Sequence, residues 1–262
     1  MFGVLYQTKG GYIMPNPTLR EEVFNNLDNR PDSLGLEKAM TETGTLLKTF
    51  VLGALMTLSA LYTWYLVGTG FADKADMLMK TGAIGGLITV FVVCFAPKNR
   101  FLAISTSIYA LFEGLFLGGI SAMFNAAYPG IVTQAILGTM LTIFGMYIAY
   151  STKLIRMSDT FRKTIFIATF AVAGIYILQW ILMFFHASIP QIFSNSPIGI
   201  GFSVVVCAIA AFNLIVDFDF IEQFKGLAPD YMEWYGAFSL MVTIVWLYVE
   251  ILKLLAKLNS RR

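Results

Sequence analysis

The 262-residue sequence predicts an all-α, polytopic membrane protein, a bundle of seven transmembrane helices. Composition is the first reason, because 57% of the residues are apolar, only 13% are charged and the mean hydropathy is +0.71. A soluble domain carries about 25% charged residues, so this chain has too few charges for a polar shell. The second reason is that seven apolar runs approach the roughly 20 residues that a bilayer-crossing helix needs. The runs do not alternate between polar and apolar residues, which excludes the strands of an outer-membrane barrel.

Each expected span is an apolar run bounded by polar, aromatic or turn residues. In order, the spans are Leu46–Val67, Met79–Ala96, Phe101–Phe124, Ile131–Ser151, Thr164–Phe185, Pro197–Val216 and Tyr235 to about Leu258. The first run ends among aromatic residues typical of a membrane interface, and Pro97 follows the second. Pro129 and Gly130 separate the third run from the fourth, a basic loop precedes the fifth, and Pro197 opens the sixth. Aromatic residues again precede the seventh, and the only histidine, His186, is expected at an interface.

Residues 1–45 differ from the rest of the chain. They contain Pro15, Pro17 and Pro31 together with six acidic and four basic residues, and they lack the apolar core of a cleaved signal peptide. We expect a polar cytoplasmic N-terminal tail, with a short surface helix around residues 18–27. The membrane domain is then expected to occupy residues 46–262.

Basic residues in the short loops predict the orientation. The loops after the second, fourth and sixth spans carry seven of them, listed in order as Lys98, Arg100, Lys153, Arg156, Arg162, Lys163 and Lys225. The opposite loops carry two, Lys74 and Lys80. The N-terminus is therefore expected in the cytoplasm. Basic residues also crowd the C-terminal end, from Lys253 to Arg262, so either that end departs from the rule or one run is re-entrant and only six cross.

Four acidic residues fall within or at the end of the apolar runs. A charge inside a membrane costs at least ~2.5–3.5 kcal/mol on insertion scales and indicates a functional site by default. Glu113 lies in the third run, Asp217 and Asp219 close the sixth, and Glu250 lies deep in the seventh. Successive helical residues turn by about 100°, so at most one of Asp217 and Asp219 faces the bundle centre.

Each acidic residue also has a purely structural interpretation. Glu250 and Lys253 are spaced i,i+3 and can pair on one helix face. Asp217 and Asp219 can be interfacial residues that cap a helix end. Glu113 is surrounded by small residues, among them Gly114 and Gly118, and can serve as a hydrogen-bonding residue where two helices cross closely.

Other functional classes lack support in the sequence. Cys94 and Cys207 have no CxxC neighbour, so a metal or redox pair is not expected. A net charge of +2 with scattered basic residues does not favour nucleic acid. No HExxH, GxSxG or nucleotide-binding motif occurs, so we expect neither an enzyme nor a cofactor.

Two segments carry a family resemblance, together with the acid in the seventh run. The first is Glu113-Gly114-Leu115-x-x-Gly118; the second runs Asp217-Phe218-Asp219-Phe220-Ile221-Glu222 and is followed by Met232-Glu233-Trp234-Tyr235-Gly236-Ala237-Phe238. With seven short spans in this order, the chain resembles the Bax inhibitor family, also called the transmembrane Bax inhibitor motif family. It looks like the bacterial members with a long polar N-terminal tail. The resemblance covers about residues 46–258.

The resemblance implies a seven-helix bundle with the last helix central, in a bacterial inner membrane, acting as a pH-sensitive calcium leak channel. The family's aspartate pair falls here on Asp217 and Glu250, which would hold calcium transiently, and its second acid is a glutamate in this chain. The family's arginine latch has no fixed match, and Arg100 and Lys253 are candidate charge partners.

Physical chemistry supports such a sensor independently. Two carboxylates in a water-poor bundle cannot both ionise cheaply, so they titrate as a unit and can share a proton. We therefore expect Asp217 and Glu250 to face each other inside the bundle. Calcium prefers six to eight oxygen ligands, and pathway acids must bind weakly enough to release it. Two alternatives stay open: a regulatory membrane protein that modulates a membrane protease or a stress response through a protein partner, and a proton-coupled transporter that uses the same acids.

Overall fold

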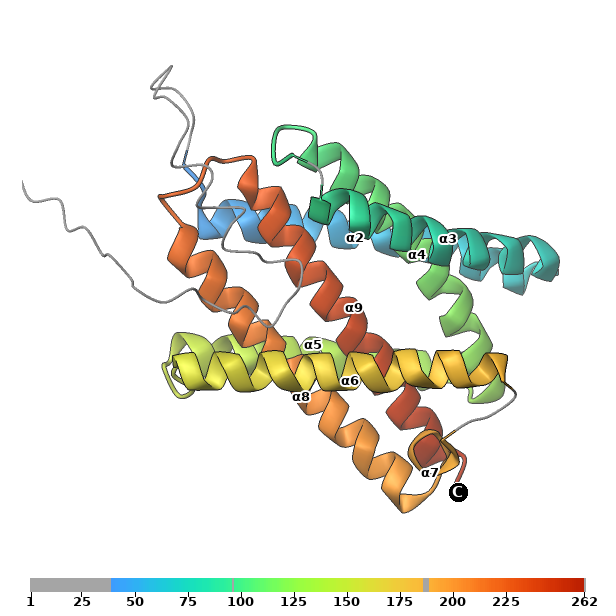
Figure 1. Ribbon diagram of the computed structural model, residues 1–262. Coiled ribbons are helices and arrows are strands. Elements are labelled where there is room, and N and C mark those ends of the chain that lie inside the picture. Colours follow the sequence, from blue (N-terminus) through green and yellow to red (C-terminus); the bar gives the residue numbers. More distant parts are fainter. Residues whose placement is uncertain (1–38, 96, 186–188, 262) are drawn as a thin grey trace, which may run out of the picture.

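The computed structural model describes residues 39–95, 97–185 and 189–261. Seven long helices and one short one make up these ranges (Figure 1). They are α2 (Glu42–Gly68), α3 (Ala72–Phe95), α4 (Leu102–Ala127), α5 (Ile131–Ser151), α6 (Asp159–Phe184), the four-residue α7 (Pro190–Phe193), α8 (Pro197–Phe224) and α9 (Met232–Asn259). The seven long helices are long and apolar enough to cross a membrane, which confirms the predicted fold class. The expected tail helix around residues 18–27 and His186 lie outside the described residues.

Most of the helices extend beyond the apolar runs because polar residues continue the helical turns at the membrane edge. α2 begins at Glu42, where the hydroxyl of Thr41 accepts a hydrogen bond from the Gly44 backbone amide at 2.9 Å. α6 begins at Asp159, after an equivalent serine cap. α8 continues to Phe224, so Asp217 and Asp219 lie inside this helix and do not end it. The interpretation of Asp217 and Asp219 as helix caps is therefore wrong.

α9 is the central helix of the bundle. It contacts α2, α4, α5 and α8, and half of its most apolar window is buried, against 11% for α6 and 17% for α3. In Figure 1, α9 runs between a group formed by α2, α3 and most of α4 and a second group formed by α5, α6 and α8. Asp217 of α8 and Glu250 of α9 are accordingly buried inside the bundle.

Glycines bring the helices of the first group into backbone contact. A Cβ atom at Gly114 or Gly118 of α4 would overlap backbone atoms of α2, at Met56 and Ala60 respectively. On α3, a Cβ atom at Gly82 would overlap the backbone of α4 at Phe112. Small residues that allow backbones to approach are the usual means of packing helices in a membrane. This group is therefore held by close main-chain packing.

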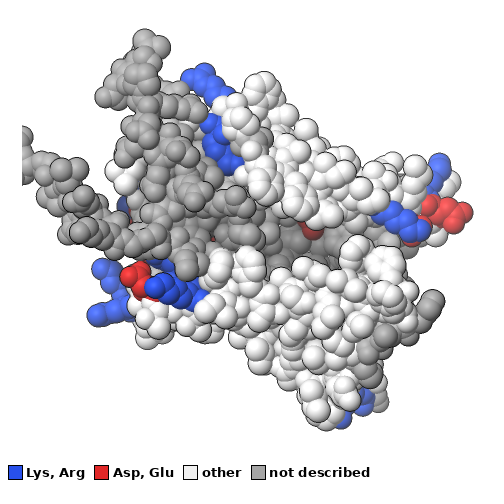
Figure 2. All heavy atoms as spheres, viewed as in Figure 1, with Lys and Arg blue, Asp and Glu red and all other residues white. Residues whose placement is uncertain are grey.

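The outer surface is apolar along the length of the helices. Large hydrophobic side chains such as Phe50, Leu141 and Phe184 are more than 65% exposed, as expected for residues that face acyl chains. Figure 2 shows the visible charged side chains gathered mainly toward the two ends of the molecule, with uncharged surface between them. This distribution is that of a bilayer-spanning protein.

Candidate functional site: buried carboxylates beside the central helix

Asp217 connects α8 to the central helix. Its side chain is fully buried. It accepts a hydrogen bond of 2.6 Å from the Thr243 hydroxyl and one of 3.3 Å from the Ser239 hydroxyl, both on α9. Ser239 and Thr243 are spaced i,i+4, so they project from one face of α9. The central helix therefore presents two hydroxyl groups to Asp217.

Glu250 is also buried, at 1% exposure, and lies further along α9. It accepts hydrogen bonds from the Tyr176 hydroxyl of α6 at 2.8 Å and from the Lys253 ammonium at 3.1 Å. The Lys253 ammonium also lies 4.7 Å from the centre of the Tyr176 ring. The predicted i,i+3 pair of Glu250 and Lys253 is therefore formed, and it is built into a contact between α6 and α9.

The two carboxylates bind different partners. Thr243, which holds Asp217, precedes Glu250 by seven residues, about 10 Å along the same face of α9. A cavity of about 220 Å³ lies in this interval, and both Thr243 and Tyr176 line it. Thr243, which bonds to Asp217, and Tyr176, which bonds to Glu250, therefore line one shared cavity.

α6 carries three polar side chains at seven-residue intervals, each bonded to the inner helices. Arg162 pairs with Asp219 of α8, and Thr169 accepts a 2.9 Å hydrogen bond from the Asn213 amide of α8. The third is the Tyr176 hydroxyl on Glu250. Seven residues make nearly two helical turns, so the three side chains share one face. We call these three contacts the α6 polar ladder.

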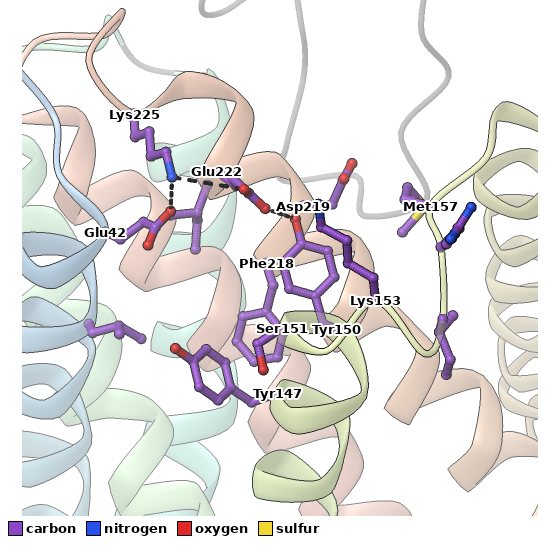
Figure 3. Close-up of a pocket in the computed structure, with 14 residues that line it drawn as sticks. Glu42, Tyr147, Tyr150, Ser151, Lys153, Met157, Phe218, Asp219, Glu222 and Lys225 are labelled. Atoms are coloured by element: carbon purple, nitrogen blue, oxygen red, sulfur yellow. Dashed lines mark hydrogen bonds and ion pairs between the residues drawn. The ribbon is translucent and has the colours of Figure 1, made fainter.

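Larger pockets lie at both ends of this region. At the α8 C-terminal end, a pocket of about 450 Å³ is bordered by Phe218 and Asp219 (Figure 3). Across its rim, Lys225 pairs with Glu42 at 2.6 Å, and Tyr150 donates a hydrogen bond to Glu222. At the other end, a pocket of about 420 Å³ is bordered by Tyr176, Lys253 and Lys257.

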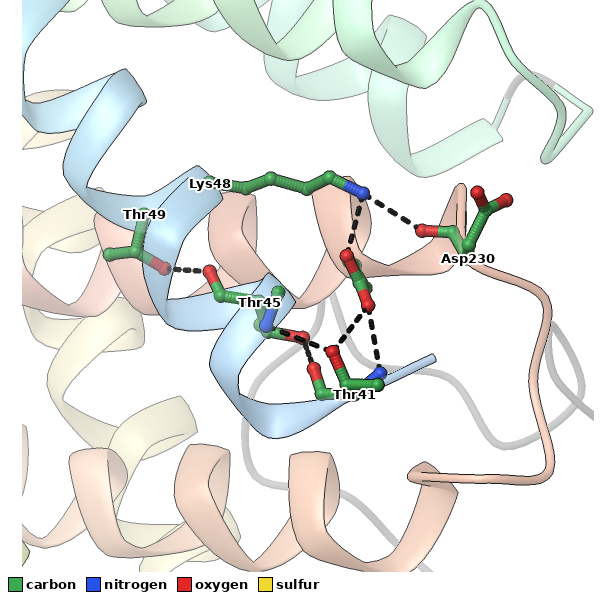
Figure 4. A network of polar contacts seen from close by, with 7 residues as sticks. Thr41, Thr45, Lys48, Thr49 and Asp230 are labelled. Carbon is green, nitrogen blue, oxygen red and sulfur yellow. Dashed lines mark hydrogen bonds and ion pairs between the residues drawn. The ribbon is translucent and has the colours of Figure 1, made fainter. Parts of the chain in front are cut away.

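Glu233 joins the start of α2 to the start of α9. Its carboxylate accepts hydrogen bonds of 2.8 and 2.9 Å from the backbone amide and hydroxyl of Thr41, and it pairs with Lys48 at 2.7 Å. Figure 4 shows the dashed contacts that reach Thr41 and Lys48. Just beyond α8, the hydrogen bond with Glu42 raises the pKa of the Lys225 ammonium above its ordinary value. These contacts fasten the chain before α2 to the turn between α8 and α9.

The other predicted residues lie apart from this site. Glu113 faces α3, where a Cβ atom at Gly86 would come within 2.8 Å of its Oε2 atom. Arg100 is exposed in the turn between α3 and α4, whereas Lys253 contacts Glu250 directly. No group of three or more histidine, cysteine or acidic side chains that could hold a metal occurs in the described ranges. A passing calcium ion would therefore need hydroxyl, carbonyl or water oxygens besides a carboxylate.

Sequence reasoning missed the hydroxyl partners of Asp217 and Glu250, and it missed Arg162 as the partner of Asp219. Thr243 and Ser239 give no signal, because hydroxyl residues are common in membrane helices and usually bond their own backbone. Arg162, Thr169 and Tyr176 do give one: they are polar positions with a constant spacing of seven, and between Thr164 and Gln179 the rest of this helix is apolar. A search for polar periodicity would have identified the inward face of α6.

Comparison with known proteins agrees with this architecture. A family model described as Bax inhibitor 1 like matches residues 16–260. No curated protein and no solved structure matches the chain. The matched range spans all seven long helices and the acids of α4, α8 and α9. The chain is therefore an integral, multi-pass membrane protein that belongs to the Bax inhibitor 1-like family, whose members are generally non-enzymatic.

Proposed function

We propose that this protein is a pH-sensitive calcium leak channel whose gate lies between α6, α8 and α9. The observation that carries the proposal is the pair of buried carboxylates, Asp217 and Glu250, whose partners Thr243 and Tyr176 line one cavity between α6 and the inner helices. Intramembrane acids of this kind mark ion or proton pathways. We also propose that the N-terminus and residues 1–45 lie in the cytoplasm, because basic residues are concentrated in the loops on that side, and that the membrane is a bacterial inner membrane, as the resemblance to bacterial family members implies.

The order of the pockets supports a route for a cation. At one end of the route lies Glu250, held by Tyr176 and Lys253. The cavity between α6 and the inner helices and then Asp217 come next, followed by the pocket bordered by Asp219. We infer that the hydrogen bonds of Glu250 to Tyr176 and of Asp217 to Thr243 close this route. Oxygen atoms of carboxylates, hydroxyls and an amide occur along the route, and calcium prefers such ligands.

Protonation would act directly on the contacts that close the route. Asp217 holds α8 to α9, and Glu250 holds α6 to α9 through Tyr176. A proton bound to either carboxylate removes its negative charge. It also turns one carboxyl oxygen into a hydrogen-bond donor, so a neighbouring hydroxyl group that donated to the carboxylate can then accept. The two acids are thereby proposed as one sensor acting through the shared cavity and the α6 polar ladder, in place of a direct carboxylate–carboxylate contact.

Calcium flux into proteoliposomes across a range of pH tests the proposal. The wild type should leak calcium with a clear pH midpoint, and Asp217→Asn and Glu250→Gln should each make the leak nearly independent of pH. Asp76→Asn is the matched control, because Asp76 is half-exposed and pairs with Lys80 on the surface. It should behave as the wild type does.

Three results would contradict the proposal. An unchanged pH midpoint in Asp217→Asn would remove that residue from the sensor. Calcium uptake against its gradient, driven by a proton gradient, would indicate a transporter. No flux above that of protein-free liposomes, with a membrane partner still bound by Glu250→Gln, would favour a regulatory interaction protein.

A further inference from the structure

The pocket at the C-terminal end of α9 combines two positive charges with aromatic walls. Lys253 and Lys257 line it, together with Phe124, Phe193 and Phe202, and its volume is about 420 Å³. A volume of this size suits a small ligand or part of a lipid. Among the residues that the structure describes, no acidic side chain lines the pocket. The pocket lies on the opposite side of the membrane domain from the basic loops that set the orientation.

The charges in this pocket are not balanced. Lys257 donates hydrogen bonds of 2.9–3.2 Å to three neutral oxygens, the backbone carbonyls of Ile192 and Gly199 and the hydroxyl of Ser203. In the part of the chain that the structure describes, no carboxylate lies within ion-pair distance of Lys257. Glu250 pairs with Lys253 alone, so the two lysines and this one acid carry a net charge of +1.

The spacing of the lysines adds to the imbalance. Residues four apart on a helix lie about 5–6 Å from each other at their Cβ atoms, and like charges there repel. The side chain of Lys253 is 37% exposed and uses one of its three N–H groups on Glu250. The hydroxyl of Tyr128 and the amide of Asn195 also line the pocket. An anion placed there would meet hydrogen-bond donors and relieve the repulsion.

We propose that this pocket binds the phosphate group of an anionic phospholipid. Lys253 supplies hydrogen bonds to the phosphate and Lys257 supplies charge, because all three N–H groups of Lys257 are already used. The aromatic walls favour an amphiphile over a free inorganic ion, since they would cover the glycerol unit and the first methylene groups. Basic pockets between transmembrane helices are suited to anionic headgroups. An anionic lipid bound there would explain why basic residues occur at the C-terminal end, on the side opposite to the basic loops.

Native mass spectrometry of the full chain, titrated with phosphatidylglycerol or phosphatidylcholine, tests this site. Lys257→Gln removes the charge while its amide still donates to the carbonyl oxygens, and Lys253→Gln removes the hydrogen-bonding ammonium. Each should weaken phosphatidylglycerol binding by about tenfold, the loss expected for one charge-assisted contact. Phosphatidylcholine binding should not change. The matched control is Lys74→Gln, an exposed lysine in the first turn of α3, with the same change in net charge.

Several results would overturn the proposal. Equal affinities of Lys257→Gln and Lys74→Gln for phosphatidylglycerol would place the lipid elsewhere. Equal binding of phosphatidylglycerol and phosphatidylcholine by the wild type would show that the net charge of the lipid does not determine binding. Full displacement of the lipid by inorganic phosphate would show a site for the free ion. If Lys257→Gln does not fold, Lys253→Gln decides the outcome, since that ammonium binds neither α7 nor α8. None of these measurements depends on calcium flux.

Discussion

α3 and α6 are both peripheral helices, yet they are attached to the bundle in opposite ways. Little of either is buried: 17% of the most apolar window in α3 and 11% in α6. α3 lies against α4 with glycine backbones in close contact, as at Gly82. α6 is held by the polar ladder of Arg162, Thr169 and Tyr176, and a cavity lies between it and the inner helices.

The difference indicates which helix can move. Close backbone packing has one good geometry, because small displacements create overlaps or voids. Polar contacts across a cavity can exchange partners with each other or with water, and two of the three involve a carboxylate whose charge depends on protonation. We therefore expect α3 to behave as a fixed wall and α6 as the movable one. This expectation rests on the same contacts as the proposed channel.

Arg162→Gln should have the largest effect on stability. It would leave the Asp219 carboxylate, which is 15% exposed, without its cationic partner. Breaking a buried ion pair in this way costs roughly 3 kcal/mol or more. The measurement is the free energy of unfolding in mixed micelles with increasing SDS. Lys80→Gln, which breaks an exposed pair with Asp76, is the control and should leave that free energy almost unchanged. Equal losses in both variants would mean that the ladder does not anchor α6.

Gly82→Ala should destabilise the other group by about 1–3 kcal/mol, the usual cost of overpacking. The added methyl group would meet the backbone of α4 at Phe112 and Phe116, which cannot rotate away. Gly174→Ala on α6 is the matched control, because nothing lies within 4 Å of its added carbon atom. That change should be neutral or stabilise the helix by up to about 1 kcal/mol. The free energies of unfolding of the two variants in SDS compare the packing of α3 with that of α6. An unchanged free energy of unfolding in Gly82→Ala would contradict the description of α3 as fixed.

Tyr176→Phe should have the smallest effect on stability and a visible effect on function. Loss of one hydrogen bond to a carboxylate costs about 1–3 kcal/mol at most, and Glu250 keeps Lys253 as a partner. With the α6–α9 contact weakened, calcium leak in proteoliposomes should rise at every pH. Tyr65→Phe, on the lipid-exposed face of α2, should leak as the wild type does. An unchanged leak in Tyr176→Phe would argue that α6 does not gate the route.

The intramembrane acids show how far sequence reasoning reaches. The sequence alone identifies Asp217 and Glu250, because a charge in an apolar run is costly wherever the helix faces. Asp217 and Asp219 are separated by about 200° around the helix, which correctly predicts that they face different neighbours. Asp217 bonds to α9 and Asp219 bonds to α6. The family was also recognisable from the order of its motifs. The expected direct pairing of Asp217 with Glu250, in contrast, depends on the axial offset between two helices, and no residue pattern encodes that offset.

The sequence by itself determined the number of long apolar helices and the positions of the costly charges. Both follow from transfer free energies that add along the chain residue by residue. Only the tertiary structure decided that hydroxyl groups meet Asp217, that α6 is held by the polar ladder, and that Lys257 lies among neutral oxygens. These outcomes depend on how far each helix slides and turns against its neighbours. In a bilayer, apolar burial hardly distinguishes one such arrangement from another, so glycine contacts and a few polar bonds select it.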